Sequence, residues 1–289
     1  MCLISVDEVA RRLHDPDLRL ADVRWFLVRP GGGLADYLAG HLPGAVFVDV
    51  ETVLAAPPGP GRHPLPEPDW LAEQLGSLGF GSEHLVVAYD DWGGVVAARL
   101  WWMLDNLGHR RVAVLDGGIA AWTAAGLPLE TEVPALPPAR LVLGDRWART
   151  IGREALRARL GAVTLLDGRA PERYRGEVEP VDPIAGHIPT ALSLPVTDSV
   201  GPDGRLLPAD ELARRYASAE GGGDAGARET VVYCGSGVNA SHHALARRVA
   251  GLPDPILYAG SYSDWTRAGF PVATGPEPGE PLGPGDRPG

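Results

Sequence analysis

Cys234 is the residue in this sequence best suited to covalent chemistry. It follows the apolar run TVVY and precedes Gly235, Ser236 and Gly237, and the helical pattern NASHHALARRVAG begins soon after. A thiol between a strand and a helix N-terminus lies where backbone N–H groups stabilise an anion, and glycines allow the positive φ values that turn those groups inward. Most free cysteines are instead buried small hydrophobic residues. The flanking glycines favour a nucleophile, so we predict that Cys234 reacts as a thiolate.

The chain carries a second, imperfect copy of the same module. Four landmark segments occur twice in the same order, and their paired positions are 143 to 146 residues apart. The pairs are LADVRW with LLDGRA, GHLPGAVFVDV with GHIPTALSLPV, LVVAYDDW with TVVYCGSG, and GGIAAWTAAGLPL with GSYSDWTRAGFPV. Such a repeat indicates a duplicated structural unit. The counterpart of Cys234 is Asp90, which has no thiol, so we expect only the second copy to be active.

Each copy alternates short apolar runs with helical patterns, which is typical of an α/β fold with a mainly parallel sheet. The runs LVVAY, RVAVLDG, VTLLDG, TVVYC and PILYAG have the length of strands. Reactive loops in such folds follow the carboxyl ends of the strands, as Cys234 does. We predict a first domain over residues 1–134, a Pro-rich linker over 135–146, a second domain over 147–274 and a disordered tail over 275–289.

Composition excludes several classes of function. The 26 basic residues are all Arg, so the chain has no lysine for a Schiff base or a Walker-type phosphate loop. Two cysteines are too few for a disulfide framework or a multi-cysteine metal site, and a net charge of −11 argues against a nucleic-acid partner. No apolar run approaches the roughly 18 residues of a membrane span. We expect a cytoplasmic protein without a membrane partner or a metal.

With these motifs in place, the chain resembles the tandem-domain sulfurtransferases of the rhodanese superfamily. The resemblance rests on DVRW, GHLPGA, RLWWML, LLDGRAPERYRG, AGHIPTALSLP, YCGSGVNA and DWTRAGFPV, which span nearly the whole chain. It implies two tandem rhodanese-like domains, each a mainly parallel five-stranded sheet flanked by helices. It also implies an inactive first domain, a Cys234 persulfide in the second, and no cofactor.

The resemblance further implies roles for the loop residues and for one arginine. The loop CGSGVNA is similar to the CGSGVTA of 3-mercaptopyruvate enzymes, whereas thiosulfate enzymes carry basic residues there. Arg173 matches the arginine that binds the donor anion, and its planar guanidinium suits a carboxylate. The alternative for Arg173 is an ordinary surface arginine. The remaining donor-binding residues implied by the loop are Gly235, Gly237, Val238 and Asn239.

In 3-mercaptopyruvate enzymes the loop serine joins a histidine and an acidic residue of the first domain in a proton relay. The matching residues here are Ser236, His63 and Glu51. The chain departs from the family at three places. Asn239 replaces a threonine and is expected to cap the following helix, Val181 lies near the place of a second donor-binding arginine, and Val95 replaces a tyrosine of the first domain.

The expected reaction moves sulfane sulfur from a small-molecule donor, with 3-mercaptopyruvate favoured, to an acceptor. The acceptor is cyanide or a thiol such as thioredoxin. Two alternatives remain open at this point. One is a thiosulfate sulfurtransferase, and the other is a rhodanese-like module that binds without turnover.

Overall fold

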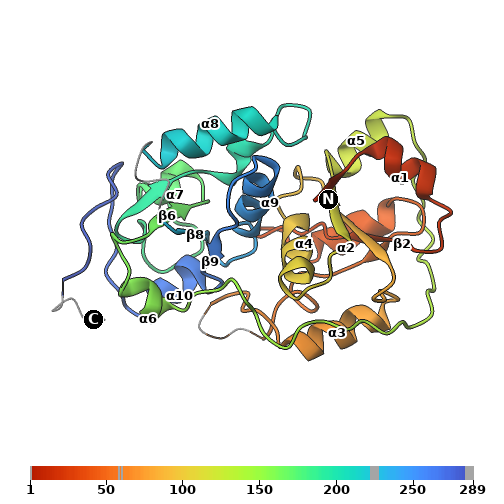
Figure 1. The fold of residues 1–289 in the computed structure, drawn as a ribbon, viewed down its shortest axis with the longest axis horizontal. Helices are drawn as coiled ribbons and strands as arrows, with labels where there is room; N and C mark the ends of the chain where they lie inside the picture. Colours follow the sequence, from red (N-terminus) through yellow and green to blue (C-terminus); the bar gives the residue numbers. More distant parts are fainter. Residues whose placement is uncertain (1, 58, 60, 222–227, 284–289) are drawn as a thin grey trace. The chain divides into compact units, whose positions relative to one another are not determined.

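The computed structural model describes residues 2–57, 59, 61–221 and 228–283, and it divides into two compact α/β units (Figure 1). The first unit comprises Met1–Ala56, Leu65–Ala148 and Val200–Leu207. The second comprises Pro57–Pro64, Arg149–Ser199 and Pro208–Gly289. Each unit therefore takes in a short segment that the linear order of the repeats assigns to the other.

The first unit is built on a parallel sheet of five strands in the order β1-β5-β4-β2-β3. The strands are β1 (Leu3–Ile4), β2 (Leu18–Asp22), β3 (Val46–Phe47), β4 (Leu85–Tyr89) and β5 (Val112–Leu115). The helices are α1 (Val6–Arg12), α2 (Gly32–Ala39), α3 (Pro68–Ser77), α4 (Ala97–Asn106) and α5 (Gly118–Ala124). Val87 and Tyr89 of the central strand pack with Trp122 in one buried cluster, because a parallel sheet is covered on both faces.

The second unit has a parallel sheet of four strands in the order β7-β6-β8-β9. Its strands are β6 (Thr164–Asp167), β7 (Ala191–Ser193), β8 (Thr230–Tyr233) and β9 (Ile256–Leu257). Its helical segments are α6 (Arg153–Arg157), α7 (Pro171–Tyr174), the 3₁₀ helix η1 (Val196–Ser199), α8 (Ala209–Ala219), α9 (Ser241–Val249) and α10 (Ser261–Arg267). β6 and β8 are paired with Asp167 opposite Tyr233, so both end at the same edge of the sheet. Cys234 follows directly at that edge.

The expectation of five strands in the second domain is wrong for the part of the chain that the structure describes. Thr150 forms an isolated parallel bridge with Leu257, at the edge where β1 pairs with β5 in the first unit. Gly152, two residues further on, is the N-cap residue of α6. The second sheet is a reduced version of the first.

The Pro-rich linker packs against the first unit. The Ala139 N–H donates to the Gly76 carbonyl at 2.9 Å, and the Gly144 N–H donates to the Leu107 carbonyl at 2.8 Å. These backbone bonds explain why the first unit continues to Ala148, beyond the boundary expected at residue 134. A Pro-rich composition predicted an extended path but not the surface that this path follows.

The tail expected to be disordered from residue 275 is ordered where it begins. The Gly275 N–H donates to the Arg175 carbonyl at 2.9 Å, and the Thr190 N–H donates to the Pro278 carbonyl at 2.6 Å. The composition of this segment predicted disorder because it offers little apolar surface, but backbone hydrogen bonds to the second unit hold it. Residues 284–289, also part of that prediction, lie outside the described residues. No helix among the described residues is long and apolar enough to cross a membrane.

Candidate active site

Cys234 lies in the loop between β8 and α9, at the carboxyl edge of the second sheet. Its side chain is buried, with 4% of its surface exposed. The Gly237 N–H points at the thiol, 3.2 Å from Sγ, and the Cys234 N–H donates to Ser261 Oγ at 3.2 Å. The loop thus folds back so that its third residue after Cys234 contacts the Cys234 sulfur atom. This arrangement presents backbone N–H groups to negative charge on that sulfur.

The two glycines of this loop are needed for different reasons. Gly237 has φ +81°, and a Cβ there would lie 2.3 Å from the Ala259 carbonyl oxygen, so both conformation and space require glycine. Gly235 does not have the expected positive φ. A Cβ at Gly235 would instead lie 2.8 Å from Nη2 of Arg62 and 3.6 Å from Nη1 of Arg173. Gly235 therefore leaves space for the Arg62 guanidinium group, while the Arg173 guanidinium group lies at ordinary contact distance.

The matching loop of the first unit shows how this backbone treats an anion. Asp90 follows β4 as Cys234 follows β8, and the helices α4 and α9 begin at equivalent distances, at Ala97 and Ser241. The buried Asp90 carboxylate accepts four backbone N–H groups at 2.7 to 2.9 Å. Burial raises the pKa of Asp90 above its usual value, and these four donors oppose that rise by stabilising the charged form. The first loop is therefore filled by its own carboxylate.

His63 and Ser236 form a close pair beside the cysteine loop. His63 Nδ1 lies 2.7 Å from Ser236 Oγ, and the two residues are only 8% and 5% exposed. The segment Pro57–Pro64, which carries His63, belongs to the second unit, contrary to the expectation that the first domain supplies this histidine. Close packing explains the assignment, since a Cβ at Gly61 would lie 2.9 Å from the Gly260 carbonyl oxygen.

Glu51, the third residue of the expected relay, belongs to the first unit. There its carboxylate accepts a hydrogen bond from Trp25 Nε1 at 3.2 Å. The Asp49 carboxylate accepts the Glu51 N–H at 2.7 Å and so fixes the turn that carries Glu51. Within the second unit, the structure brings together Cys234, Ser236 and His63.

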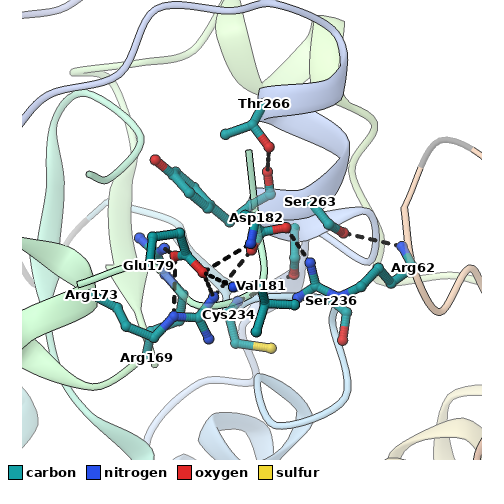
Figure 2. A network of polar contacts seen from close by, with 12 residues as sticks. Arg62, Arg169, Arg173, Glu179, Val181, Asp182, Cys234, Ser236, Ser263 and Thr266 are labelled. Atoms are coloured by element: carbon teal, nitrogen blue, oxygen red, sulfur yellow. Dashed lines mark hydrogen bonds and ion pairs between the residues drawn. The ribbon is translucent and has the colours of Figure 1, made fainter. Parts of the chain in front are cut away.

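Arg173 projects from α7 into a cluster of charged side chains next to Gly235 (Figure 2). Its Nη2 donates to Glu179 Oε1 at 2.6 Å and to Asp182 Oδ2 at 3.1 Å. Although burial raises the pKa of Glu179, hydrogen bonds from Arg173 and from the N–H groups of Asp182 and Val181 hold that pKa below its usual value. Arg173 is therefore not an ordinary surface arginine.

A second buried ion pair, between Arg169 and Asp167, contacts this cluster through Glu179. Arg169 donates through Nε and Nη2 to both oxygens of Asp167, at 2.7 to 3.1 Å, and both side chains are almost fully buried. Burial raises the pKa of Asp167, but the adjacent guanidinium holds it below its usual value. Arg169 Nη1 also lies 3.3 Å from Glu179. The Glu179 carboxylate is thus fixed between two arginines.

The last two predicted donor-binding residues complete the loop. Val238 is buried, and Asn239 is partly buried. The expected helix cap by Asn239 is wrong, because α9 has Ala240 at its N-cap position and no side-chain cap. The Asn239 Oδ1 atom is buried without a hydrogen-bond partner among the described residues. Asn239 therefore keeps a free acceptor within the active loop.

Sequence reasoning missed three residues of the charged cluster, namely Arg62, Glu179 and Asp182. Arg62 directly precedes His63, and the two acidic residues follow the PERYRG motif that carries Arg173. Proximity to predicted site residues was therefore an available signal for all three. Among the described residues, no group of three or more His, Cys, Asp or Glu side chains could hold a metal ion.

Comparison with known proteins places this geometry in a family. The rhodanese-like domain matches residues 5–125 and again 153–268. A Pseudomonas aeruginosa protein named "Probable 3-mercaptopyruvate sulfurtransferase" is 46% identical over 280 residues, covering 94% of this chain and 98% of that protein. The thiosulfate sulfurtransferase of Azotobacter vinelandii is 35% identical over 266 residues, covering 91% of this chain and 93% of that protein.

A solved structure agrees with the sequence matches. The crystal structure of a 3-mercaptopyruvate sulfotransferase from Escherichia coli superimposes with a TM-score of 0.80 at 30% identity, over 90% of this chain and 98% of that chain. The expected pair of rhodanese-like domains is confirmed. With its two α/β units and full-length relatives, the chain belongs to the rhodanese family of sulfurtransferases.

Proposed function

We propose that this protein is a 3-mercaptopyruvate sulfurtransferase in which Cys234 carries the transferred sulfur as a persulfide. The observation that carries the proposal is the arrangement around Cys234. Its sulfur receives the Gly237 N–H, and the next side chain in the loop, Ser236, is hydrogen-bonded to His63. The nucleophile Cys234 and the Ser236–His63 pair, which is able to move a proton, therefore lie close together in a buried site.

In the first half-reaction the Cys234 thiolate attacks the sulfur of 3-mercaptopyruvate. A sulfur–sulfur bond forms, the carbon–sulfur bond breaks, and its electron pair leaves with pyruvate as the enolate. The enolate takes up a proton, for which the Ser236–His63 pair is suitably placed beside the thiol. The products are pyruvate and a Cys234 persulfide. Glu51 is the acidic residue that the family pattern assigns to this proton relay.

In the second half-reaction an acceptor removes the outer sulfur. A thiol, such as that of thioredoxin, attacks this sulfur and becomes a persulfide, while Cys234 returns to the thiol form. Cyanide acts in the same way and leaves as thiocyanate. The N–H groups of the loop support the persulfide anion, since the matching loop of the first unit holds a carboxylate on four such groups.

The balance of charge beside Gly235 favours a donor with one negative charge. The cluster there contains three guanidinium groups and three carboxylates, namely Arg62, Arg169, Arg173, Asp167, Glu179 and Asp182. A cluster without net charge is less suited to the doubly charged thiosulfate than to the single carboxylate of 3-mercaptopyruvate. Thiosulfate is the second candidate, because three relatives are named thiosulfate sulfurtransferases, two of them as putative.

Mass spectrometry and steady-state kinetics test the proposal. After incubation with 3-mercaptopyruvate and removal of the donor, we expect a mass increase of one sulfur atom on the peptide that contains Cys234. The matched variants are C234S, which should lose this adduct and all turnover, and C2S, which should keep both. An unmodified Cys234 peptide would contradict the persulfide. A higher kcat/KM for thiosulfate than for 3-mercaptopyruvate would contradict the choice of donor.

A further inference from the structure

Two arginines from distant parts of the chain meet over the residue that follows the nucleophile. Arg62 comes from the loop that carries His63, and Arg173 comes from α7. The place of a Gly235 Cβ lies 2.8 Å from Arg62 Nη2 and 3.6 Å from Arg173 Nη1. The Arg62 N–H also donates to Ser263 Oγ at 3.1 Å, which fixes the loop on the second unit. Both guanidinium groups therefore border the space beside Cys234.

These two guanidinium groups already share one carboxylate. Arg62 Nη1 is hydrogen-bonded to Asp182 Oδ1, and Arg173 Nη2 lies 3.1 Å from Asp182 Oδ2 (Figure 2). The Asp182 side chain is 1% exposed, and each arginine side chain is 15% exposed. The Nε atom of Arg62 is buried without a hydrogen-bond partner among the described residues. Arg62 and Arg173 can thus bind a carboxylate together, and the Arg62 Nε–H is still available for a further hydrogen bond.

Arg169, the third arginine of the cluster, is not available in this way. Two of its nitrogens are committed to Asp167, its Nη2 also donates to the Gly186 carbonyl at 2.6 Å, and its side chain is 1% exposed. The Arg169 guanidinium is therefore enclosed, whereas the Arg62 and Arg173 side chains are each 15% exposed. Arg62 and Arg173 are the arginines of this cluster whose guanidinium groups lie beside Gly235.

We propose that Arg62 is a donor-binding residue of this enzyme, which pairs with Arg173 to hold the donor's anionic group while Asp182 occupies the pair in its absence. The identification of the anion as a donor rests on the proposed function. Arg62 then supplies the charge that the chain lacks at Val181, where it has no arginine. Asp182 acts as an internal competitor, so the donor binds by taking over contacts that Asp182 makes. Because the Asp182 side chain is 1% exposed, the loss of these contacts opposes donor binding.

Alkylation of Cys234 tests the anion site without any sulfur transfer. Iodoacetate and iodoacetamide react with a thiolate in the same way and release iodide, but only iodoacetate carries a carboxylate. In a C2S background we expect R62Q to slow iodoacetate about 10- to 100-fold more than iodoacetamide, because hydrogen bonds to a charged group are lost. R214Q, an exposed arginine on α8, is the matched control and should change neither rate. Equal slowing of both reagents by R62Q would overturn the proposal.

Steady-state kinetics then connect the site to the donor. R62Q should raise the KM for 3-mercaptopyruvate by about 10- to 100-fold with a smaller change in kcat, as expected when a binding contact is lost. R62K should recover part of the loss because it keeps the charge but not the planar fork. If the wild type turns over the donor and R62Q has an unchanged KM, the role of Arg62 is wrong while the proposed function stands. If the wild type shows no turnover but the alkylation rates separate, the reverse holds.

The role of Asp182 is tested by the variant D182N, which should change donor binding in the opposite direction to R62Q. D182N removes the competing charge but keeps an acceptor for Arg62 and Arg173. We expect a lower KM for 3-mercaptopyruvate and faster alkylation by iodoacetate, each by a few-fold, about 3- to 10-fold. If D182N weakens donor binding as R62Q does, Asp182 positions the arginines instead of competing with the donor, and this part of the proposal is overturned.

Discussion

Removal of the Ser236 hydroxyl should affect the two candidate donors very differently. S236A deletes the 2.7 Å contact with His63 Nδ1 and removes no other side-chain atom from the loop. With 3-mercaptopyruvate the leaving enolate needs a proton, and positioned proton transfer contributes about 10²- to 10⁴-fold to a rate. With thiosulfate the leaving group is sulfite, which needs no proton. We therefore expect kcat to fall by about 10²- to 10⁴-fold with 3-mercaptopyruvate and by about twofold or less with thiosulfate.

The assay follows pyruvate and sulfite release by the same enzyme preparation, so that differences in folding cancel. His63 provides the companion variant, because both atoms of the pair are buried and act on one proton. H63N should reproduce the donor-specific loss, and S236A/H63N should add little to either single loss, as expected for residues that act as a unit. An equal loss with both donors would refute the reasoning, since Ser236 would then shape the loop and not move a proton.

Three further predictions concern the two matching loops and the helix α9. G237A should abolish persulfide formation measured by mass spectrometry, because the residue has φ +81° and its Cβ would lie 2.3 Å from the Ala259 carbonyl oxygen. D90A should lower the free energy of unfolding in urea by about 3 kcal/mol or more, because four buried N–H groups lose their acceptor, whereas D90N should cost less. Burial lowers the pKa of His243 from 6.5 to about 3, so the unfolded chain binds an extra proton between these values. The free energy of unfolding should therefore fall as the pH drops from about 6.5 towards 3, and H243Q should flatten that dependence in acid denaturation.

The sequence predicts those parts of the fold and site that depend on local signals. Repeated apolar runs identify a duplicated α/β unit, and glycines between a strand and a helix identify the loop of Cys234. The membership of His63 in the second unit has no local signal, because it depends on the approach of Gly61 to Gly260. Nor does a sequence indicate that Asp182 is hydrogen-bonded to an arginine 120 positions away.

The reduced second sheet illustrates the same limit. The segment before α6 carries strand-forming residues, Thr150 and Ile151, but it forms one bridge. The resemblance to tandem rhodanese-like domains implies a fifth strand here, but the described residues form only this bridge. In the first unit Ser5 caps α1 directly after Ile4, as Gly152 caps α6 directly after Ile151, so the spacing to the helix does not distinguish a two-residue strand from a single bridge.

The two matching loops suggest why only one copy can carry sulfur. In both, a tight loop presents backbone N–H groups at the carboxyl end of a central strand. In the first unit the Asp90 carboxylate reaches those groups itself and occupies four of them, so these four are not available to an external anion. The Cys234 side chain extends one bond less from the backbone than that of Asp90, and its Sγ receives one such N–H. An additional sulfur on Cys234 would extend the side chain towards the length of Asp90. It would also bring negative charge into the loop, and the matching loop of the first unit binds the negative charge of Asp90 through four backbone N–H groups.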